Sequence, residues 1–140
     1  MNNLEIIKRK IEDIKSYIKI LRTISKKYTT NYVLYDTILK GALERYFFLL
    51  IQSTIDLASA VVAYEKIGKS FTYMQAFELL AQNKIIPTKT LPELKAMIGA
   101  RNILVHEYAK VDLKILLDDL EQNIKTVQKV MKYIKKHLLI

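Results

Sequence analysis

Apolar residues in this chain recur at steps of three and four positions over long stretches, which is the period of an amphipathic α-helix. The first such stretch covers residues 3–27, where Lys, Arg and Glu fill many of the intervening positions. Its apolar members are Leu4, Ile7, Ile11, Ile14, Ile18 and Leu21. The polar sequence KKYTTN at residues 26–31 then interrupts the pattern. We therefore expect a first helix over residues 3–27, followed by a connection.

A second helix is expected to be long and largely buried. The positions that define its face are Leu39, Leu43, Phe47, Leu50, Thr54, Leu57 and Val61. We expect it to end with Gly68 in the C′ position, just after the helix C-terminus, where glycine is favoured. Thr72 is a suitable N-cap for a shorter third helix over residues 73–82, which the connection at residues 83–87 would close.

Two further helix starts are marked by side chains that can cap them. Thr90 and Glu93 have the spacing of a capping box, and Pro92 lies in the first turn, where its missing N–H does no harm. A fourth helix is therefore expected from residue 91 to about residue 107. Asp112 would cap a last helix that continues to the end of the chain. Its apolar positions are Leu113, Leu116, Leu120, Ile124, Val127, Met131, Ile134 and Leu138.

The composition agrees with an all-helical fold. The 140 residues include three Gly and two Pro, which leaves little room for the turns of a sheet with many short strands. A chain of this length fits one domain. We predict that residues 1–140 form a single all-α domain, an antiparallel four-helix-type bundle with one accessory short helix.

The net charge favours a polyanionic partner. Lys and Arg number 23 against 14 Asp and Glu, which gives a formal net charge of +9 at pH 7. The lysines are spread over several helices, so a solvated basic surface explains them equally well. The absence of Cys excludes disulfide and thiolate chemistry, and the longest apolar run, residues 46–51, is too short to span a bilayer. We expect a cytoplasmic protein without a membrane partner, metal or cofactor.

The sequence RNILVHEY, residues 101–108, places four functional side chains at the end of the fourth helix. At roughly 100° per residue, Arg101 and Tyr108 share one face of that helix. Asn102 and His106 are four residues apart and share the adjoining face. Glu107 points away from all of them. The four side chains therefore form one candidate site.

Arg101 falls in the middle of the stripe that should face the core, among Leu94, Met97, Ile98, Leu104 and Val105. A lone buried charge is unfavourable, so we expect either a carboxylate partner or a position at a subunit interface with a wet cleft. Asp56, in an otherwise apolar stretch of the second helix, is the best candidate for that partner, with Glu44 second. Gly99 and Ala100 would let another backbone approach closely, as a tight interface requires.

An arginine and an imidazole together suit cleavage of RNA without a metal. The ribose 2′-hydroxyl attacks the neighbouring phosphorus, while a base removes its proton and an acid protonates the leaving oxygen. The planar fork of Arg101 suits the charge that builds on the phosphoryl oxygens. The cluster offers one histidine for two roles, since His137 lies in the lysine-rich C-terminal tail. A two-fold homodimer would supply the second copy of Arg101 and His106.

Taken singly, these residues have ordinary explanations. A histidine near a helix end is usually a surface residue, an arginine in an apolar stripe is often in a structural ion pair, and Tyr108 is one of nine tyrosines. A different class of function also fits the cluster: a non-catalytic adaptor that grips a nucleotide or phosphate as a subunit of a nucleotidyltransferase complex. A third alternative is a helical bundle with a scaffold role, which would leave Arg101 in the apolar stripe unexplained.

The spacing of Arg101, His106 and Tyr108 resembles the RX4HXY signature of the HepT-like branch of the HEPN superfamily. The resemblance extends over nearly the whole chain, including residues 41–65 and 83–112. It implies a helical bundle that dimerises and a ribonuclease with Arg101 and His106 as catalytic residues. Asn102 would orient His106 or contact a phosphate.

The resemblance also implies a partner encoded alongside the chain, a minimal nucleotidyltransferase antitoxin of the MntA kind. In this family the antitoxin transfers AMP to the motif tyrosine, here Tyr108. Because Tyr108 shares a face with Arg101 in the expected helix, the added phosphates would compete for the guanidinium and block RNA. Tyr108 would then be a switch and not a catalyst.

Overall fold

A computed structural model describes residues 2–106 and 112–140 of the chain. In chain order the elements are α1 (Asn3–Lys27), α2 (Thr30–Tyr35), α3 (Thr37–Glu65), α4 (Tyr73–Gln82), the 3-10 helix η1 (Thr88–Thr90), α5 (Leu91–His106) and α6 (Leu113–Leu138). Neither of the two described ranges contains a strand. The predicted all-α class is confirmed.

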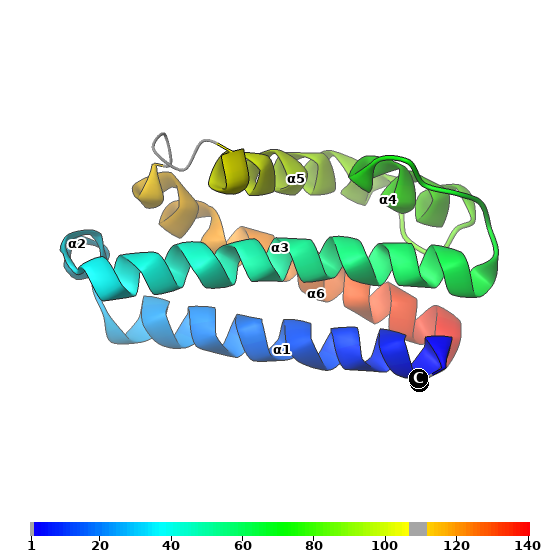
Figure 1. Cartoon of the computed structure of the whole chain (residues 1–140), viewed down its shortest axis with the longest axis horizontal. Coiled ribbons are helices and arrows are strands. Elements are labelled where there is room, and N and C mark those ends of the chain that lie inside the picture. The colour runs from blue at the N-terminus through cyan, green and yellow to red at the C-terminus, as the bar shows by residue number, and fades with distance from the viewer. Residues whose placement is uncertain (1, 107–111) are drawn as a thin grey trace.

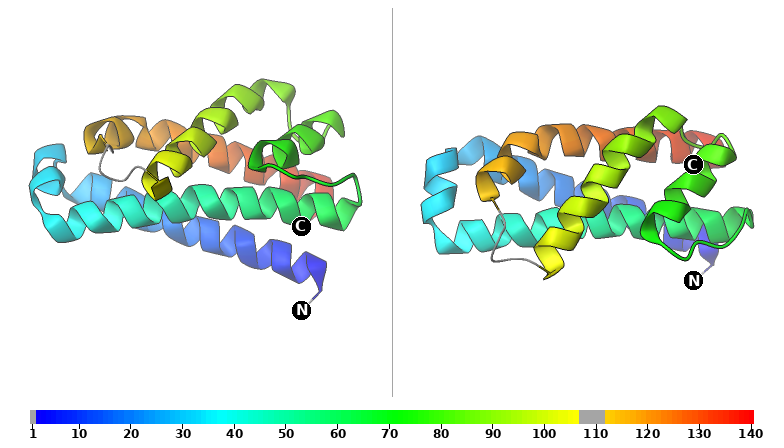
Figure 2. Two further views of the ribbon diagram at one scale, coloured as in Figure 1. Left: turned by 45° about the horizontal axis from the view of Figure 1, so that its top comes forward. Right: turned by 90° about the horizontal axis from the view of Figure 1, so that it is seen from above.

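The three long helices α1, α3 and α6 lie lengthwise along the molecule, and α4 and α5 cover one side of α3 (Figure 1). Seen from above, α5 runs obliquely from the C-terminal part of α6 across to α3 (Figure 2). The core is formed by apolar faces such as the isoleucines of α1 and the Phe47 face of α3. This oblique crossing carries the last turn of α5 to the edge of the bundle.

α1 and α6 follow the sequence pattern closely. Every buried residue of α1 belongs to one stripe, namely Ile7, Ile11, Ile14, Ile18, Leu21 and Ile24. A hydrogen bond from Arg22 Nη2 to Glu121 Oε1, 2.6 Å long, joins the two helices at the surface. This bond and the positive charge of Arg22 lower the pKa of the Glu121 carboxyl. The predicted bounds of both helices are confirmed.

The start of α6 also agrees with the prediction. The Asp112 carboxylate accepts hydrogen bonds from the backbone N–H groups of Lys114 and Ile115, at 3.0 and 3.3 Å. These bonds satisfy donors that have no partner within the first turn of a helix. The predicted cap at Asp112 is therefore confirmed.

Two details between α1 and α4 differ from the prediction. The polar stretch after α1 is not only a connection, because it leads into α2, which Thr29 caps through a hydrogen bond to the N–H of Tyr32. α3 ends before Gly68, since Lys66 takes the left-handed C-cap conformation with φ 56°. Gly68 itself has φ 145° in the loop that follows. The helix therefore ends slightly before the predicted position, and Lys66 takes the left-handed conformation in place of Gly68.

The two predicted capping sites before α4 and α5 have different outcomes. Thr72 caps α4 in a capping box with Gln75. The same spacing at Thr90 and Glu93 does not form one. The Thr90 hydroxyl donates to the carbonyl of Pro87, at 2.7 Å, inside η1, and the Glu93 carboxylate accepts from the Thr126 hydroxyl of α6, at 2.8 Å. The predicted start of α5 is right, but Glu93 ties α5 to α6 instead of capping it.

α3 is the central helix of the bundle. By length and composition alone it is apolar enough to cross a membrane, with a mean hydropathy of 1.6 in its most apolar window, although no single uninterrupted apolar run in it is long. Of that window, 56% is buried inside the bundle. A central core helix produces the same pattern, so the composition of α3 is explained by its packing.

Candidate active site

Arg101 lies where α5 passes over α3 and α4, and both of those helices hold its guanidinium. Nε donates a hydrogen bond of 2.9 Å to Gln52 Oε1 of α3, and Nη2 donates one of 3.3 Å to the hydroxyl of Tyr73 in α4. The guanidinium carbon also lies 5.6 Å from the ring centre of Phe48 and 5.0 Å from that of Tyr73. These contacts fix its position without neutralising its charge.

Asp56 is not the direct partner of Arg101, so that prediction is wrong. Its carboxylate accepts a hydrogen bond of 3.0 Å from Gln52 Nε2 and forms a 3.6 Å ion pair with Lys10 of α1. Gln52 and Asp56 are one turn apart on α3, and α5 crosses at the level of Gln52. Asp56 therefore reaches Arg101 only through Gln52, and the guanidinium receives an amide oxygen in place of a carboxylate.

Because its partners are neutral, Arg101 keeps its positive charge, and some of its N–H donors remain unused. A guanidinium has five N–H donors, and the third hydrogen bond within the described residues runs from Nη1 to Asn102 Oδ1, at 3.2 Å. Gln52, Tyr73 and Asn102 together thus use three donors. The side-chain carbonyl oxygen of Asn102 thus faces Arg101, as expected for two members of the predicted site. An arginine held in this way can still bind a phosphate.

The second half of α5 is open to solvent. The buried residues of α5, Leu94 and Met97, both lie in its first half, whereas Ile103 and Val105 in the second half are 42% and 40% exposed. The expectation that the apolar stripe faces the core as far as Val105 is wrong. The reason is the oblique crossing of α5, which carries its last turns past α3 (Figure 2).

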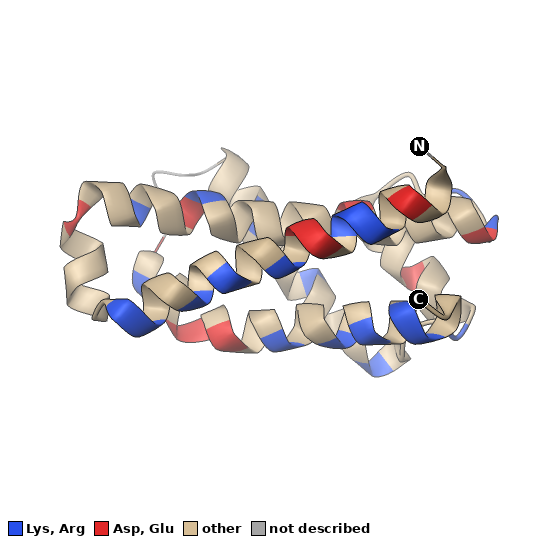
Figure 3. Ribbon diagram, turned by 90° about the horizontal axis from the view of Figure 1, so that it is seen from below, with Lys and Arg blue, Asp and Glu red and all other residues tan. Residues whose placement is uncertain are grey.

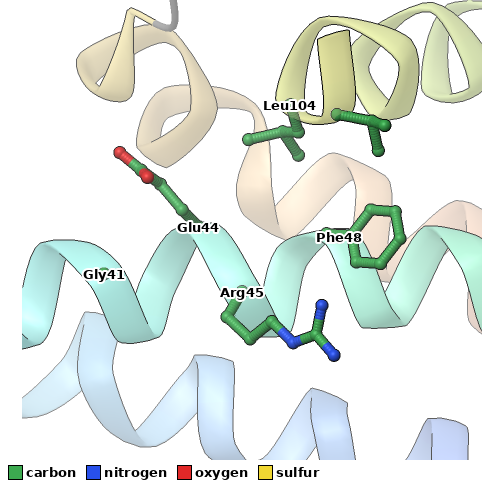
Figure 4. Close-up of a pocket in the computed structure, with 6 residues that line it drawn as sticks. Gly41, Glu44, Arg45, Phe48 and Leu104 are labelled. Atoms are coloured by element: carbon green, nitrogen blue, oxygen red, sulfur yellow. The ribbon is translucent and has the colours of Figure 1, made fainter. Parts of the chain in front are cut away.

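A groove of about 420 Å³ lies beside Arg101, between α3 and the last turn of α5. It is lined by Gly41, Glu44, Arg45, Phe48, Leu104 and Val105, and Figure 4 shows Phe48 reaching from α3 toward Leu104. Arg45 lies over the same Phe48 ring, 5.4 Å from its centre. Glu44, the second candidate partner of Arg101, lines this groove and does not pair with Arg101. The groove thus adds a second guanidinium near the site.

His106 is the last residue of α5 and is exposed. Tyr108, which the sequence predicts beside Arg101, lies outside the described residues. In the described part of the chain, no group of three or more His, Asp or Glu side chains is arranged to hold a metal ion.

Sequence reasoning missed four residues of this site: Arg45, Phe48, Gln52 and Tyr73. Gln52 carries a weak signal, since it is an amide in an apolar stretch one turn before Asp56. The other three have no signal of their own. Arg45 and Phe48 become neighbours of Arg101 only through the crossing of α3 and α5, and Tyr73 only through the packing of α4 against both.

Comparison with known proteins identifies the family of the chain. The profile of the family described as "Ribonuclease HepT-like" matches residues 7–134. The mRNA nuclease HepT of Shewanella oneidensis is 28% identical over 134 residues, which cover 94% of this chain and 97% of that protein. The tRNA nuclease HepT of Aphanizomenon flos-aquae is 31% identical over 114 residues, which cover 80% of this chain and 77% of that protein.

A solved structure shares the fold over almost the full length. It is the tri-AMPylated HEPN toxin of Shewanella oneidensis in complex with an MNT antitoxin, with a TM-score of 0.85 and 27% identity. The similarity covers 97% of this chain and 99% of that one. The helical bundle, the family profile and the two nuclease relatives lead to one conclusion: the chain belongs to the HepT-like family of HEPN ribonucleases.

Proposed function

We propose that this chain is the toxin of a toxin–antitoxin pair and cleaves RNA without a metal ion, with Arg101 and His106 as its catalytic residues. The observation that carries this proposal is the set of neutral contacts that hold Arg101 at the open end of α5, five residues before the exposed His106. Membership in a ribonuclease family favours this enzyme over the non-catalytic adaptor.

The reaction needs a base, an acid and a cation. The ribose 2′-oxygen attacks phosphorus, the bond from phosphorus to the 5′-oxygen breaks, and the products carry a 2′,3′-cyclic phosphate and a 5′-hydroxyl. One imidazole takes the 2′-proton and another protonates the leaving 5′-oxygen. Arg101 binds the phosphoryl oxygens with the donors that Gln52, Tyr73 and Asn102 leave unused.

The two imidazoles come from two copies of the chain in this proposal. Ile103, Val105 and Ile115 expose 42%, 40% and 56% of their surface next to the site. Ile103 and Ile115 also line a groove of about 260 Å³ between α5 and α6, together with Ala96, Ala100, Leu104 and Leu116. Exposed apolar side chains around an incomplete site favour a two-fold homodimer, which brings the same patch together twice.

The antitoxin is proposed to be a minimal nucleotidyltransferase that modifies Tyr108. A relative of known structure is a tri-AMPylated toxin bound to its MNT antitoxin, and Tyr108 stands two residues after His106. Phosphates attached there would add negative charge within reach of Arg101 and compete with RNA. The pair is proposed to act in the cytoplasm, since the chain has no Cys and shows no use for an oxidising compartment.

The central experiment measures RNA cleavage by the purified chain in the presence of a chelator. The wild type should leave 2′,3′-cyclic phosphate ends and should not cleave an oligonucleotide that lacks 2′-hydroxyls. His106→Ala should lower the cleavage rate by about a thousandfold, within the usual range for a general acid or base. His137→Ala is the matched control, because this histidine pairs with Glu65 far along α6. If His106→Ala and His137→Ala cleave alike, the catalytic assignment is wrong.

The modification has its own test. After co-expression with the neighbouring nucleotidyltransferase, mass spectrometry should find one or more AMP groups on Tyr108, and Tyr108→Phe should escape inhibition. An inactive complex whose Tyr108 is unmodified would show that the antitoxin blocks the site by occlusion.

A further inference from the structure

The charges of α6 are divided unevenly along its length. Its first turns carry Asp118, Asp119 and Glu121, whereas residues 122–140 contain five Lys and neither Asp nor Glu. Figure 3 shows the same division, with acidic positions in the first part of this helix and basic positions along the rest. The C-terminal part of α6 is therefore strongly basic.

Four lysines line one groove, and three of them come from this part of α6. Lys129, Lys132 and Lys136 of α6 face Lys89 of η1 across a groove of about 480 Å³, which Thr90, Glu93 and Tyr133 also line. Positions 129, 132, 133 and 136 follow helical spacing and so share one face of α6. We call the site formed by Lys89, Lys129, Lys132 and Lys136 the lysine groove.

Little within the described chain neutralises the lysine groove. Glu93 is its one acidic lining residue, and its carboxylate already accepts a hydrogen bond from Thr126. The ion pairs among described residues involve other lysines, such as Lys10 and Lys15. Four like charges around one groove repel one another, and a bound polyanion would relieve that repulsion.

Tyr133 indicates what kind of polyanion fits. Its ring lies among the lysines and is 36% exposed. A basic groove that follows a backbone, combined with an aromatic ring on which a base can stack, is the usual arrangement in proteins that bind single-stranded nucleic acid. A phosphate-rich ligand without bases would have no use for Tyr133.

The lysine groove is connected to the proposed active site by a single helix. Glu93 lines the groove, and Arg101 follows it by eight residues on α5, which is about 12 Å along the helix axis at 1.5 Å per residue. A stacked strand advances about 3.4 Å per nucleotide, so on the order of four nucleotides span this interval. Along the helix axis, the two places are therefore within the reach of one RNA strand.

We propose that the lysine groove binds the backbone of the RNA substrate several nucleotides away from the cleaved bond, with a base stacked on Tyr133. Naming RNA as the ligand rests on the proposed ribonuclease function. The groove itself rests on its four lysines and its tyrosine. It would anchor the substrate, while Arg101 and His106 act on the phosphodiester.

The first test measures binding in the absence of cleavage. A fluorescent single-stranded oligonucleotide of about a dozen 2′-O-methyl nucleotides is titrated with the full-length chain at several salt concentrations. The variant Lys129→Gln/Lys132→Gln/Lys136→Gln should bind at least tenfold more weakly. Its salt slope should fall by about 2, since each lost phosphate contact removes about 0.7 for a single strand.

The matched control removes three exposed lysines from elsewhere on the bundle, as Lys8→Gln/Lys40→Gln/Lys69→Gln. It has the same net charge as the groove variant and should lose no more than about twofold in affinity. Equal losses in the two triple variants would mean that overall charge alone attracts RNA, and the proposal would be overturned. Melting temperatures of both variants are compared with wild type to verify folding.

Tyr133→Leu distinguishes the contribution of base stacking from that of the phosphate contacts. It should weaken binding of the oligonucleotide about tenfold, because stacking on an aromatic ring contributes ~1–3 kcal/mol per base, and leave binding of inorganic polyphosphate unchanged. If Tyr133→Leu binds both ligands like wild type, no base stacks there and the assignment to RNA is overturned. If the groove variant binds RNA normally but loses the nucleotidyltransferase partner, the groove is a protein contact and the proposal is wrong.

Cleavage assays test the lysine groove independently of the proposed catalytic residues. The groove variant should raise KM for a dozen-nucleotide RNA about tenfold with little change in kcat, and should cleave a dinucleotide like wild type. If wild type cleaves no RNA yet the groove variant loses binding, the ribonuclease assignment fails and the groove stands. If wild type cleaves RNA and the groove variant matches the control triple in both assays, the groove assignment fails alone.

Discussion

The two halves of α5 are built for different purposes. The first half contributes Leu94 and Met97 to the core and is tied to α6 by the bond between Glu93 and Thr126. The second half exposes Ile103, Val105 and His106, and it is held by the polar contacts of Arg101 and by the partly buried Ala100 and Leu104. Because one rigid helix joins the halves, packing in the first half positions the functional groups of the second. Substitutions in the first half should therefore change stability, and those in the second should change activity or assembly.

The largest effect is expected in the first half, from Leu94→Ala. Leu94 is fully buried, so its truncation should lower the free energy of unfolding by ~2–5 kcal/mol through lost burial and a residual cavity. Chemical denaturation measures this loss. Below the unfolding transition, the folded fraction should cleave RNA nearly as well as wild type. A folded but inactive Leu94→Ala would show that the two halves do not divide the work in this way.

Arg101→Lys tests the second half of α5, where we expect a loss of activity with little loss of stability. Lysine keeps the charge but cannot bridge Gln52, Tyr73 and a phosphate at once, because it lacks the planar fork. Cleavage should fall by about 100-fold, which is the usual effect of losing one stabilising donor in the transition state. The free energy of unfolding should change by less than about 1 kcal/mol at this half-exposed position. Wild-type cleavage by Arg101→Lys would mean that charge alone suffices.

Ile103→Asp tests whether the open face of α5 pairs with a second copy. Ile103 is 42% exposed, so the folded chain should tolerate the change, whereas two carboxylates facing each other across a two-fold interface should weaken a dimer by about tenfold or more. Sedimentation equilibrium over a dilution series measures this constant. Ile6→Asp on α1, where Ile6 is 36% exposed, is the control and should leave assembly unchanged. A wild-type dimer constant in Ile103→Asp would place the interface elsewhere.

The features that the sequence predicted well depend on local patterns. The bounds of α1 and α6 follow from helical periodicity, and the caps at Thr72 and Asp112 each involve atoms within one turn. α2 was missed because six residues are too few to show a period. The supposed box at Thr90 and Glu93 failed although its spacing matched, because Thr126, 33 residues from Glu93 along the chain, engages that carboxylate.

The site shows the same limit. The motif predicted a cluster of Arg101, Asn102, His106 and Tyr108. Within the described residues Arg101 and Asn102 are in contact, and the other surroundings of Arg101 depend on where α5 crosses α3. Sequence alone identified a carboxylate in an apolar helix and so favoured Asp56. It could not show that the crossing falls one turn earlier, at Gln52. Packing between helices decides such contacts, and the periodicity of a sequence does not show at which turn one helix crosses another.

The smallest expected effects distinguish Gln52 from Asp56. Gln52→Leu removes the acceptor of the 2.9 Å bond from Arg101 Nε, so the guanidinium loses one of its positioning contacts, and kcat/KM for RNA should fall about tenfold. A hydrogen bond to a charged group contributes ~1.5–3 kcal/mol, or roughly 10- to 150-fold, and the tenfold loss is at the lower end because the other contacts of Arg101 remain. Asp56→Asn keeps an acceptor for Gln52 Nε2 and removes only a charge whose side chain is 41% exposed and 3.6 Å from Lys10.

Asp56→Asn should therefore lower kcat/KM by less than about threefold, because a solvent-exposed ion pair contributes ~0–1 kcal/mol. Both variants should unfold within about 1 kcal/mol of wild type, so that cleavage and not folding is compared. The reverse order, with Asp56→Asn more damaging than Gln52→Leu, would mean that the Asp56 charge acts on Arg101 directly. In that case the open end of α5 would depend on an ion pair with α3, and the contrast between its two halves would largely disappear.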